Sequence, residues 1–542
     1  MGNAIYAVPT PINEPVLTYA AGTRERREIK AELERQSSAV IDIPLVIGGK
    51  EVRTALKGRC VMPHDKSHVL AEYSIAGENE LKAAVNAAMD AKTQWYALPW
   101  EHRASIFLKA ADLLAGPWRQ RINAATMLGQ SKTVYQAEID SACELADFLR
   151  FNVHYAQEIY KNQPISPASV WNRMEYRPLS GFVMAISPFN FTAIGGNLAT
   201  APALMGNTVV WKPASTAVLS NYMFFQILHE AGLPDGVINF VPCKGKDVSE
   251  HVMKDPRMAG FHFTGSTDVF SGVWRLVGEN IRIYENYPRL VGETGGKDFI
   301  FAHSSARIQP LVTAMIRGAF EYQGQKCSAA SRAYIPESLW PDVKKLLLKE
   351  VSSIRTGDVK DFRNFMGAVI DEASYRSIVQ YIDFARNSDD AEILCGEYSD
   401  SKGWFVYPTV ILAKRPDFKT MKEEIFGPVL TVYVYPDDQF EATMLNCHEV
   451  TPYALTGAIF AQDRKLLSRM EQELADTAGN FYINDKPTGA VVGQQPFGGG
   501  RASGTNDKAG SVLNLLRWTS PRAIKETFLP PDSVSYPFMD EE

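Results

Sequence analysis

Hydrophobic residues in the first third of the chain recur at the three- and four-residue spacing of helices that bury one face. The pattern covers residues 79–95 and 102–115, and it continues from Lys132 to Tyr160. Residues at this spacing lie on the same side of a helix, so a run of apolar ones marks a buried face. This third of the protein is therefore predicted to be mainly helical.

After Pro178 the pattern changes to short runs rich in β-branched and aromatic residues. Runs of this length and composition are typical of buried strands. The predicted strands are Phe182 to Ile186, Thr208 to Trp211, Val237 to Val241 and Gly260 to Phe263.

A helix is predicted between two of these strands, over Thr216 to Ala231, where an amphipathic pattern stops at Gly232 and Pro234. Strands that alternate with helices in this way predict a parallel, doubly wound α/β sheet. A second series of the same kind begins at Lys297 and runs to about Tyr435, which predicts a second α/β domain.

Two segments follow neither pattern and are predicted to be extended arms. Ile165 to Arg177 is polar and contains proline, while Leu513 to Tyr536 contains several prolines and few helix formers. An isolated arm cannot bury its apolar face, so each arm either pairs with another subunit or packs on its own domain.

Length and composition indicate an ordinary folded protein of two or three domains, with 542 residues of which 45% are hydrophobic and 22% charged. A formal net charge of -6 provides no basic field for nucleic acid or an anionic membrane, so a small-molecule partner is expected. No apolar stretch approaches the roughly 20 residues of a membrane-spanning helix.

The cysteines and the N-terminus bear on the compartment. The chain has six cysteines with no Cys-x-x-Cys pair, which indicates free thiols in a reducing compartment. Met1 to Pro15 lacks a basic start followed by an apolar core, so no secretory or transit signal is recognised there. A cytoplasmic protein is expected, with a mitochondrial matrix protein after removal of a transit peptide as the alternative.

Three segments carry candidate catalytic residues. Cys327 lies among small and polar residues and is a candidate nucleophile, although a single cysteine is more often a small buried hydrophobic residue. Glu293 precedes two glycines and is either a general base or a solvated loop charge. Asn190 follows the strand that ends at Ile186, where it is either an oxyanion donor or a turn residue.

Other strand ends offer residues for a nucleotide. Lys212 and Glu424 are candidates to hold ribose hydroxyls, although a single lysine at a strand end is more often only solvated. The segment Phe263 to Thr267 ends a strand and opens a helix, which is either a phosphate site or a simple N-cap. The sequence contains no Gly-x-Gly-x-x-Gly fingerprint. No metal site is expected, because His64 and His68 lack a third ligand.

Taken in order, six motifs resemble those of the aldehyde dehydrogenase superfamily, and they cover nearly the whole chain. They are Pro188 to Asn190, Trp211 to Pro213, Phe263 to Ser266, Glu293 to Lys297, Gly324 to Cys327 and Glu424 to Pro428. The resemblance implies the aldehyde dehydrogenase fold, with a Rossmann-like NAD-binding domain, a second α/β catalytic domain and a small β oligomerisation arm.

The resemblance also implies domain boundaries. Residues 1–40 would form an N-terminal arm, residues 41–164 and 182–292 the NAD-binding domain, and residues 293–498 the catalytic domain. Residues 165–181 and 499–542 would form the oligomerisation arm and build a dimer or a higher homo-oligomer.

Roles in catalysis and binding follow from the resemblance as well. Cys327 would attack the aldehyde, Asn190 would hold the oxyanion and Glu293 would activate water. The implied NAD-binding residues are Ser187, Lys212, Gly265, Ser266, Glu424 and Phe426. The implied substrate-binding residues are Glu144, Phe191, Ser328, Gly489, Ala490 and Phe497.

Within the superfamily, the chain looks most like members that oxidise L-glutamate γ-semialdehyde to L-glutamate with NAD, the last step of proline catabolism. The segments that carry this likeness are Ser187 to Ala193, Phe320 to Arg332 and Gly479 to Lys486. The alternatives are another carboxylated semialdehyde as substrate, or a non-catalytic structural or binding member.

Two residues depart from the common superfamily pattern. Ser215 stands where many NAD-specific members have glutamate, which leaves use of NADP open. Thr294 stands where a leucine commonly follows the general base, and the sequence assigns it no role.

Overall fold

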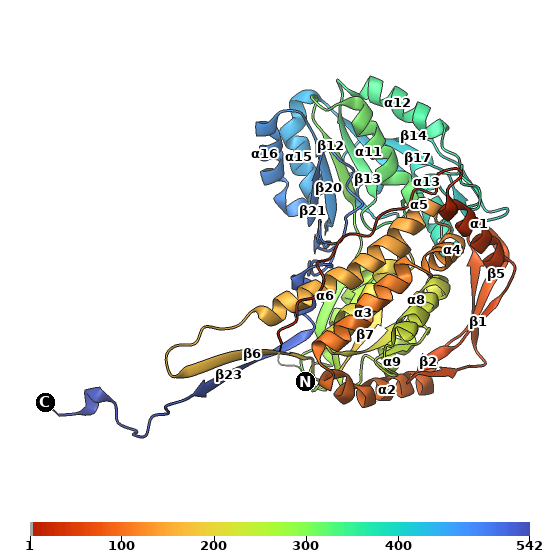
Figure 1. Ribbon diagram of the computed structural model, residues 1–542. Helices are drawn as coiled ribbons and strands as arrows, with labels where there is room; N and C mark the ends of the chain where they lie inside the picture. Colours follow the sequence, from red (N-terminus) through yellow and green to blue (C-terminus); the bar gives the residue numbers. More distant parts are fainter. Residues whose placement is uncertain (1–3, 542) are drawn as a thin grey trace.

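Two seven-stranded sheets organise the computed structural model, which describes residues 4–541 (Figure 1). The first sheet has five parallel strands, and two antiparallel strands extend one edge. Its order is β11 (Arg289–Glu293), β10 (Met258–Thr264), β7 (Phe182–Ile186), β8 (Thr208–Lys212), β9 (Ile238–Phe240), β2 (Leu45–Ile47) and β3 (Lys50–Val52). The predicted parallel α/β sheet is confirmed.

Helices cover both faces of this sheet, so its strands are apolar on both sides. Val183 and Ala185 of β7 point into one apolar cluster, and Phe182 and Met184 into the other. The first cluster contains side chains of α3 (Trp100–Ala115), α4 (Arg119–Gln130), α6 (Leu145–Lys161), α7 (Thr192–Leu204) and α8 (Val218–Ala231). The second contains side chains of α2 (Glu78–Ala97), α9 (Gly245–His251) and α10 (Thr267–Glu279).

The second sheet is parallel except for the edge strand β14. Its order is β14 (Ala391–Cys395), β17 (Thr409–Ala413), β18 (Val429–Tyr435), β13 (Ala330–Pro336), β12 (Asp298–Ala302), β20 (Thr456–Phe460) and β21 (Asn480–Ile483). One face packs on α11 (Ile308–Phe320) and α12 (Trp340–Ser352), and the other on α13 (Glu372–Arg386), α15 (Phe440–Glu449) and α16 (Arg464–Glu473). The predicted end of this series near Tyr435 was too early, since β20 and β21 follow it.

The N-terminal third is less uniformly helical than predicted. Helices α2 and α3 and the long segment ending in α6 agree with the prediction, although residues Glu138–Glu144 form a π-helical turn, η1. A three-stranded sheet of β1 (Ile41–Ile43), β5 (Asp65–Ser74) and β4 (Lys57–Met62) was not predicted. Irregularities in the β4 and β5 pairing disrupt the alternation of apolar and polar residues that would have indicated strands.

Both predicted arms contain an extended strand, and the two strands pair with each other within the same chain. The second arm begins later than predicted, because Leu513 to Leu516 belong to the helix α17 (Val512–Leu516). Strands β6 (Val170–Pro178) and β23 (Thr519–Thr527) form an antiparallel ribbon of nine residue pairs. The ribbon projects from the body of the protein at the lower left of Figure 1. Its base is fixed by Trp518, which is fully buried and lies with its ring 4.6 Å from that of His262.

No helix within residues 4–541 has both the length and the apolar character needed to cross a membrane.

Candidate active site

The two sheets are joined by a short link that lies against Cys327. Strand β11 ends at Glu293, and β12 begins at Asp298. A Cβ atom added to Gly296 in this link would lie 2.2 Å from the carbonyl oxygen of Cys327. Only glycine allows so close an approach, which places the link between Glu293 and Asp298 directly beside the loop that carries the thiol.

The loop before Cys327 has a strained backbone that a buried amide holds in place. Tyr322, Gln323 and Gly324 have φ angles of 52°, 55° and 64°, in the left-handed region that non-glycine residues rarely adopt. The side-chain amide of Gln323 makes three hydrogen bonds to the backbone of Ser131, Gly367 and Ala368. These bonds fix the turn and therefore the position of Cys327.

Asn190 is fixed to the same loop from the first sheet. It is buried between β7 and α7, and its Nδ2 donates a 3.1 Å hydrogen bond to the carbonyl oxygen of Gln325. An amide nitrogen carries two hydrogens, so Asn190 keeps a second donor beyond this bond. The structure thus brings two predicted catalytic residues, Asn190 and Cys327, to one loop.

Glu293, the third predicted catalytic residue, occupies the end of β11. Its Oε2 accepts a 3.3 Å hydrogen bond from the backbone N–H of Gly499. Burial raises the pKa of Glu293 well above its usual value, although the Gly499 N–H and the charge of Lys508 act in the opposite direction. A carboxylate with a raised pKa is a stronger base than an ordinary one, as a general base requires.

Burial also raises the pKa of the Cys327 thiol well above its usual value, and the charges of Asp298, Glu424 and Glu293 add to this effect. The three carboxylates are therefore near enough to disfavour the thiolate. The resting thiol is protonated at neutral pH, and its proton must be removed before it can act as a nucleophile.

Alkylation of Cys327 by iodoacetamide should therefore accelerate by about tenfold per pH unit from about pH 7 to 9, because only the thiolate reacts. The raised pKa means that the thiolate fraction is still increasing throughout this range. The rate is measured by mass spectrometry of the peptide that contains Cys327. A rate that levels off near neutral pH would show that the pKa is lowered instead.

A cleft of about 900 Å³ leads to Cys327 along the carboxyl ends of β7, β8 and β10. This edge is where doubly wound sheets bind nucleotides. Its walls are partly apolar, with Val248, Val269, Val273 and Leu276 among them. The predicted residues that line it are Ser187, Asn190, Lys212, Gly265, Ser266, Cys327, Glu424 and Phe426.

The polar groups along this cleft suit a dinucleotide. Ser266 caps the N-terminus of α10 by accepting a 3.4 Å hydrogen bond from the backbone of Val269, and the first turn of a helix favours phosphate. Burial lowers the pKa of Lys212, whose Nζ bonds the carbonyl oxygen of Pro213 at 3.3 Å. Ser187 accepts a 2.9 Å bond from the indole nitrogen of Trp211.

Glu424 and Phe426 reach the cleft from the second sheet. Glu424 Oε1 accepts a 2.9 Å hydrogen bond from the backbone N–H of Gly296, and burial raises the pKa of Glu424 to about 7. The Phe426 ring meets that of Phe189 edge to face, with 5.8 Å between their centroids. The cleft is therefore lined both by residues at the strand ends of the first sheet and by the segment that leads into β18 of the second.

The predicted substrate residues do not line this cleft. The Ser328 and Thr488 hydroxyls are 2.7 Å apart, which ties the residue after Cys327 to the loop that contains Gly489 and Ala490. Phe497 closes that loop by a backbone bridge to Ala509. This loop, residues 488–497, is called the carboxylate loop below, after the role predicted for Gly489 and Ala490.

Glu144 and Phe191 lie around a buried lysine that sequence reasoning missed. The Lys132 Nζ is 4.1 Å from the centre of the Phe191 ring and 2.6 Å from Asp140. Burial raises the pKa of Glu144 to about 8, an effect to which the charge of Asp140 adds. Asp140 also accepts bonds from the backbone of residues 192 and 193, beside Phe191.

Lys297 and Asp298 were also missed, although two charged residues directly before the apolar run of β12 are a recognisable signal. Both are fully buried. Within residues 4–541 the Lys297 Nζ has no hydrogen-bond partner, and burial lowers the pKa of Lys297 to about 7. Thr294 bonds the carbonyl oxygen of Ala502 at 2.7 Å, so it anchors the same link to a loop near the C-terminus.

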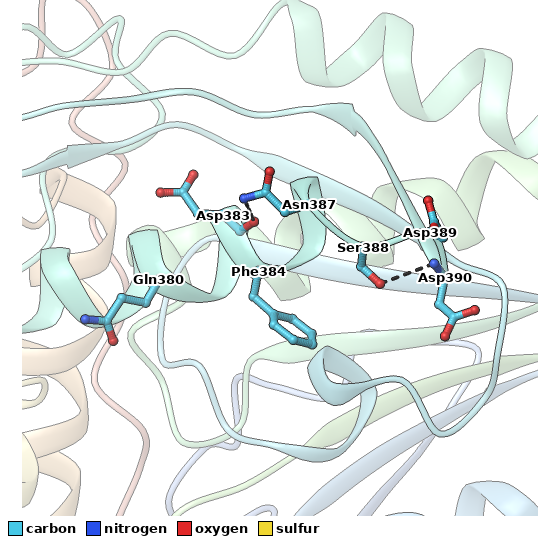
Figure 2. Close-up of a pocket in the computed structure, with 7 residues that line it drawn as sticks. All are labelled: Gln380, Asp383, Phe384, Asn387, Ser388, Asp389 and Asp390. Carbon is cyan, nitrogen blue, oxygen red and sulfur yellow. Dashed lines mark hydrogen bonds between the residues drawn. The ribbon is translucent and has the colours of Figure 1, made fainter.

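A second, open depression contains none of the predicted site residues. Figure 2 shows it at the end of α13, where it is lined by Gln380, Asp383, Phe384, Asn387, Ser388, Asp389 and Asp390. Its polar groups mainly bond to their own neighbours, as Asn387 does to the carbonyl oxygen of Asp383 at 2.9 Å. In the described part of the chain, no group of three or more His, Cys, Asp or Glu side chains is arranged to hold a metal ion.

Comparison with known proteins gives matches over nearly the whole chain. The profile described as "Aldehyde dehydrogenase family" matches residues 53–524. The mitochondrial delta-1-pyrroline-5-carboxylate dehydrogenase of Dictyostelium discoideum is 56% identical over 536 residues, which cover 98% of this chain and 96% of that protein. The human mitochondrial protein of the same name is 50% identical over 529 residues, which cover 97% of this chain and 94% of that protein.

Solved structures agree with these matches. The crystal structure of delta-pyrroline-5-carboxylate dehydrogenase from Mycobacterium tuberculosis bound with NAD is 53% identical to this chain, with a TM-score of 0.96. The alignment covers 99% of this chain and 100% of that structure.

Proposed function

The chain belongs to the aldehyde dehydrogenase family, and from this premise we propose that it oxidises L-glutamate γ-semialdehyde to L-glutamate with NAD, the last step of proline catabolism. The observation that carries the proposal is the 50–56% identity over nearly the whole chain to relatives named delta-1-pyrroline-5-carboxylate dehydrogenase. The meeting of Cys327, Asn190 and Glu293 around the link between the two sheets supports it.

Cys327 forms the covalent bond to the substrate in this proposal. Its thiolate attacks the aldehyde carbon, and the carbonyl oxygen becomes an oxyanion held by the free Asn190 N–H and the backbone N–H of Cys327. Loss of hydride from the same carbon leaves an acyl thioester on Cys327. Glu293 then takes a proton from the water that attacks the thioester, and the carboxylic acid leaves as the Cys327 thiolate is restored.

The cleft fits NAD by its volume, its helix N-terminus and its position at the carboxyl ends of the strands. Lys212 and Glu424 would hold the riboses, Ser187, Gly265 and Ser266 would line the pyrophosphate and adenosine path, and Phe426 would close the cleft. When bound there, NAD supplies the hydride acceptor. The relative of known structure from M. tuberculosis was solved with NAD, which supports this assignment.

The carboxylate loop and its neighbours would select the substrate. Ser328 and the backbone of Gly489 and Ala490 would bind the α-carboxylate. Phe191 and Phe497 would clamp the aliphatic stem. Glu144, half-buried at the end of η1, would lie near the aldehyde.

We divide the chain into the domains expected from the sequence, namely an arm of residues 1–40, an NAD-binding domain of residues 41–164 and 182–292, and a catalytic domain of residues 293–498. Residues 165–181 and 499–542 form the oligomerisation arm. An isolated two-stranded ribbon is marginally stable in water, and Trp171 on this one is 51% exposed. A homodimer or higher homo-oligomer in which the ribbon pairs with a second copy would cover it.

Of the two compartments expected from the sequence, we propose the mitochondrial one, because the names of the D. discoideum and human relatives describe those proteins as mitochondrial.

The proposal is tested by NADH formation from glutamate γ-semialdehyde, with succinate semialdehyde and NADP as comparisons. We expect the fastest turnover with glutamate semialdehyde and NAD. Faster turnover of succinate semialdehyde would assign a different carboxylated substrate. An absence of NADH formation with any aldehyde would support a non-catalytic member instead.

A further inference from the structure

The N-terminal residues 4–22, called the strap below, lie extended against the helices that surround the substrate residues. In Figure 1 the strap is the dark red trace that runs past α6 to α1 (Arg24–Ser37). Its contacts are with α4, η1 and α6. The Gln157 side chain of α6 donates a 2.6 Å bond to the Tyr6 carbonyl oxygen, and the Leu17 N–H donates a 2.8 Å bond to Glu138 of η1.

Asn13 connects this strap to the carboxylate loop. Its Nδ2 donates two 2.8 Å hydrogen bonds, one to Asp147 of α6 and one to the carbonyl oxygen of Val492. Its Oδ1 accepts a 2.9 Å bond from the side chain of Gln494. Both ends of the amide are therefore used, and three segments of the chain meet at this one side chain.

The carboxylate loop rests on α6 at the same place. Gly493 has a φ of +81°, and a Cβ atom there would lie 2.2 Å from the Phe151 ring of α6. Val492 is buried in the apolar cluster that includes α6. The loop therefore rests on α6, and its residues Val492 and Gln494, which bond Asn13, follow closely on the predicted carboxylate-binding residues Gly489 and Ala490.

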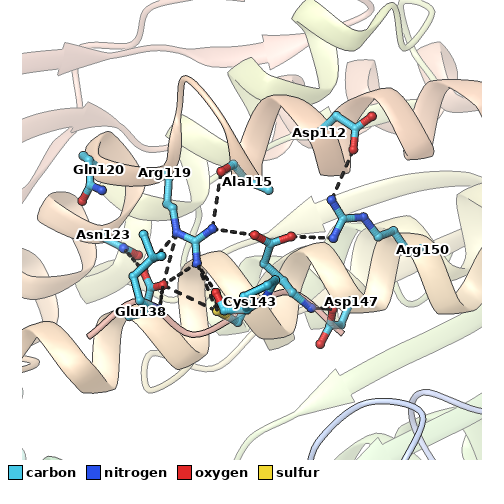
Figure 3. Close-up of polar contacts among 12 residues, drawn as sticks. Asp112, Ala115, Arg119, Gln120, Asn123, Glu138, Cys143, Asp147 and Arg150 are labelled. Carbon is cyan, nitrogen blue, oxygen red and sulfur yellow. Dashed lines mark hydrogen bonds and ion pairs between the residues drawn. The ribbon is translucent and has the colours of Figure 1, made fainter. Parts of the chain in front are cut away.

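The strap beside Asn13 is itself held by buried charges. Glu14 bonds Arg119 and Arg150 at 2.6 Å each, and only 12% of its side chain is exposed. Arg119 in turn pairs with Glu138, as Figure 3 shows. Asp147 accepts a 2.7 Å bond from the backbone N–H of Glu14, so the carboxylate that binds Asn13 also fixes the residue after it. Asn13 is thus presented from a rigid support.

We propose that Asn13 is a positioning residue for the carboxylate loop, and that the strap thereby sets the affinity of the enzyme for carboxylated aldehydes. The inference rests on the proposed function, because it assigns the α-carboxylate to this loop. Asn13 acts through Val492 and Gln494 and does not contact the reacting atoms. The dinucleotide cleft is lined by other segments, and the loop meets the neighbour of the reacting thiol at the contact between Thr488 and Ser328.

Asn13→Ala is expected to raise KM for glutamate semialdehyde by about tenfold, while kcat stays within about twofold of the unchanged protein. Oxidation of butanal, which has no carboxylate, should keep its kcat/KM, and NAD affinity measured by tryptophan fluorescence should not change. Gln494→Ala removes only the hydrogen bond that the loop donates to Asn13. It should likewise lower kcat/KM for glutamate semialdehyde relative to kcat/KM for butanal. Thr10→Ala, at an exposed strap position, is the matched control and should leave kcat/KM for both aldehydes unchanged.

The ratio of the two kcat/KM values separates positioning from general damage. Equal losses with glutamate semialdehyde and butanal, or no loss with either, would overturn the role of Asn13. If the unchanged protein shows no preference for glutamate semialdehyde over butanal, the proposed function fails first and this inference fails with it. Melting temperatures of all variants show whether each is folded under the assay conditions.

Discussion

Replacing Cys327 with alanine is expected to abolish aldehyde oxidation and to leave NAD affinity nearly unchanged. The substitution removes the atom that we propose bonds to the substrate, and loss of a covalent nucleophile lowers kcat by on the order of 10⁴-fold or more. The other residues that line the cleft, among them Lys212 and Ser266 at the N-terminus of α10, are unchanged in this variant. Steady-state NADH formation and tryptophan fluorescence on NAD titration measure the two effects separately.

Cys395→Ala is the matched control for this experiment. Cys395 is also a partly exposed free thiol, but it lies on the edge strand β14 of the second sheet. Its removal should leave kcat within about twofold of the unchanged value. Turnover that survives in Cys327→Ala would show that the thiol is not the nucleophile.

Replacing Glu293 is expected to stop the reaction after hydride transfer. Glu293→Gln keeps an oxygen that can accept the Gly499 N–H but removes the base that we propose activates water, and general-base catalysis contributes about 10²- to 10⁴-fold. Rapid mixing with substrate should therefore give a burst of about one NADH per subunit, followed by a slow steady rate. Intact-mass measurement should detect the acyl group on Cys327.

Glu423→Gln changes an exposed carboxylate of the same type and should show no such burst. Normal steady turnover by Glu293→Gln would assign deacylation to another base. Loss of the burst together with the steady rate would instead place the role of Glu293 before hydride transfer, in removing the proton from the Cys327 thiol.

The strands that were predicted well are those whose own residues are enough to indicate where the strand begins and ends. Phe182 to Ile186 is buried on both faces, so its apolar run ends where the strand ends. Lys212 ends the parallel strand β8 and Gly265 follows the parallel strand β10, and such strands bring their carboxyl ends to one edge of the sheet. Motifs at the ends of distant strands therefore meet in one cleft.

The features that sequence reasoning missed depend on contacts between distant segments. The bond from Asn13 to Val492 joins residues 479 positions apart, and nothing near Asn13 indicates it. Lys132 and Asp140 form a buried pair that spans the short helix α5 (Val134–Ala137) and the start of η1, where no single helical spacing applies. The two arms were both predicted to be extended, but their mutual pairing depends on a register that only the folded body sets.

That pairing has a consequence for how the chain is made. The ion pair between Arg173 and Glu526 across the ribbon joins residues 353 positions apart. At roughly 5–20 residues per second, strand β6 leaves the ribosome tens of seconds before its partner exists. During that interval its backbone donors and acceptors and the Trp171 ring are open to any other nascent strand. Synthesis of the C-terminal residues therefore determines when the open edge of β6 becomes paired, and until then chaperones must prevent its aggregation.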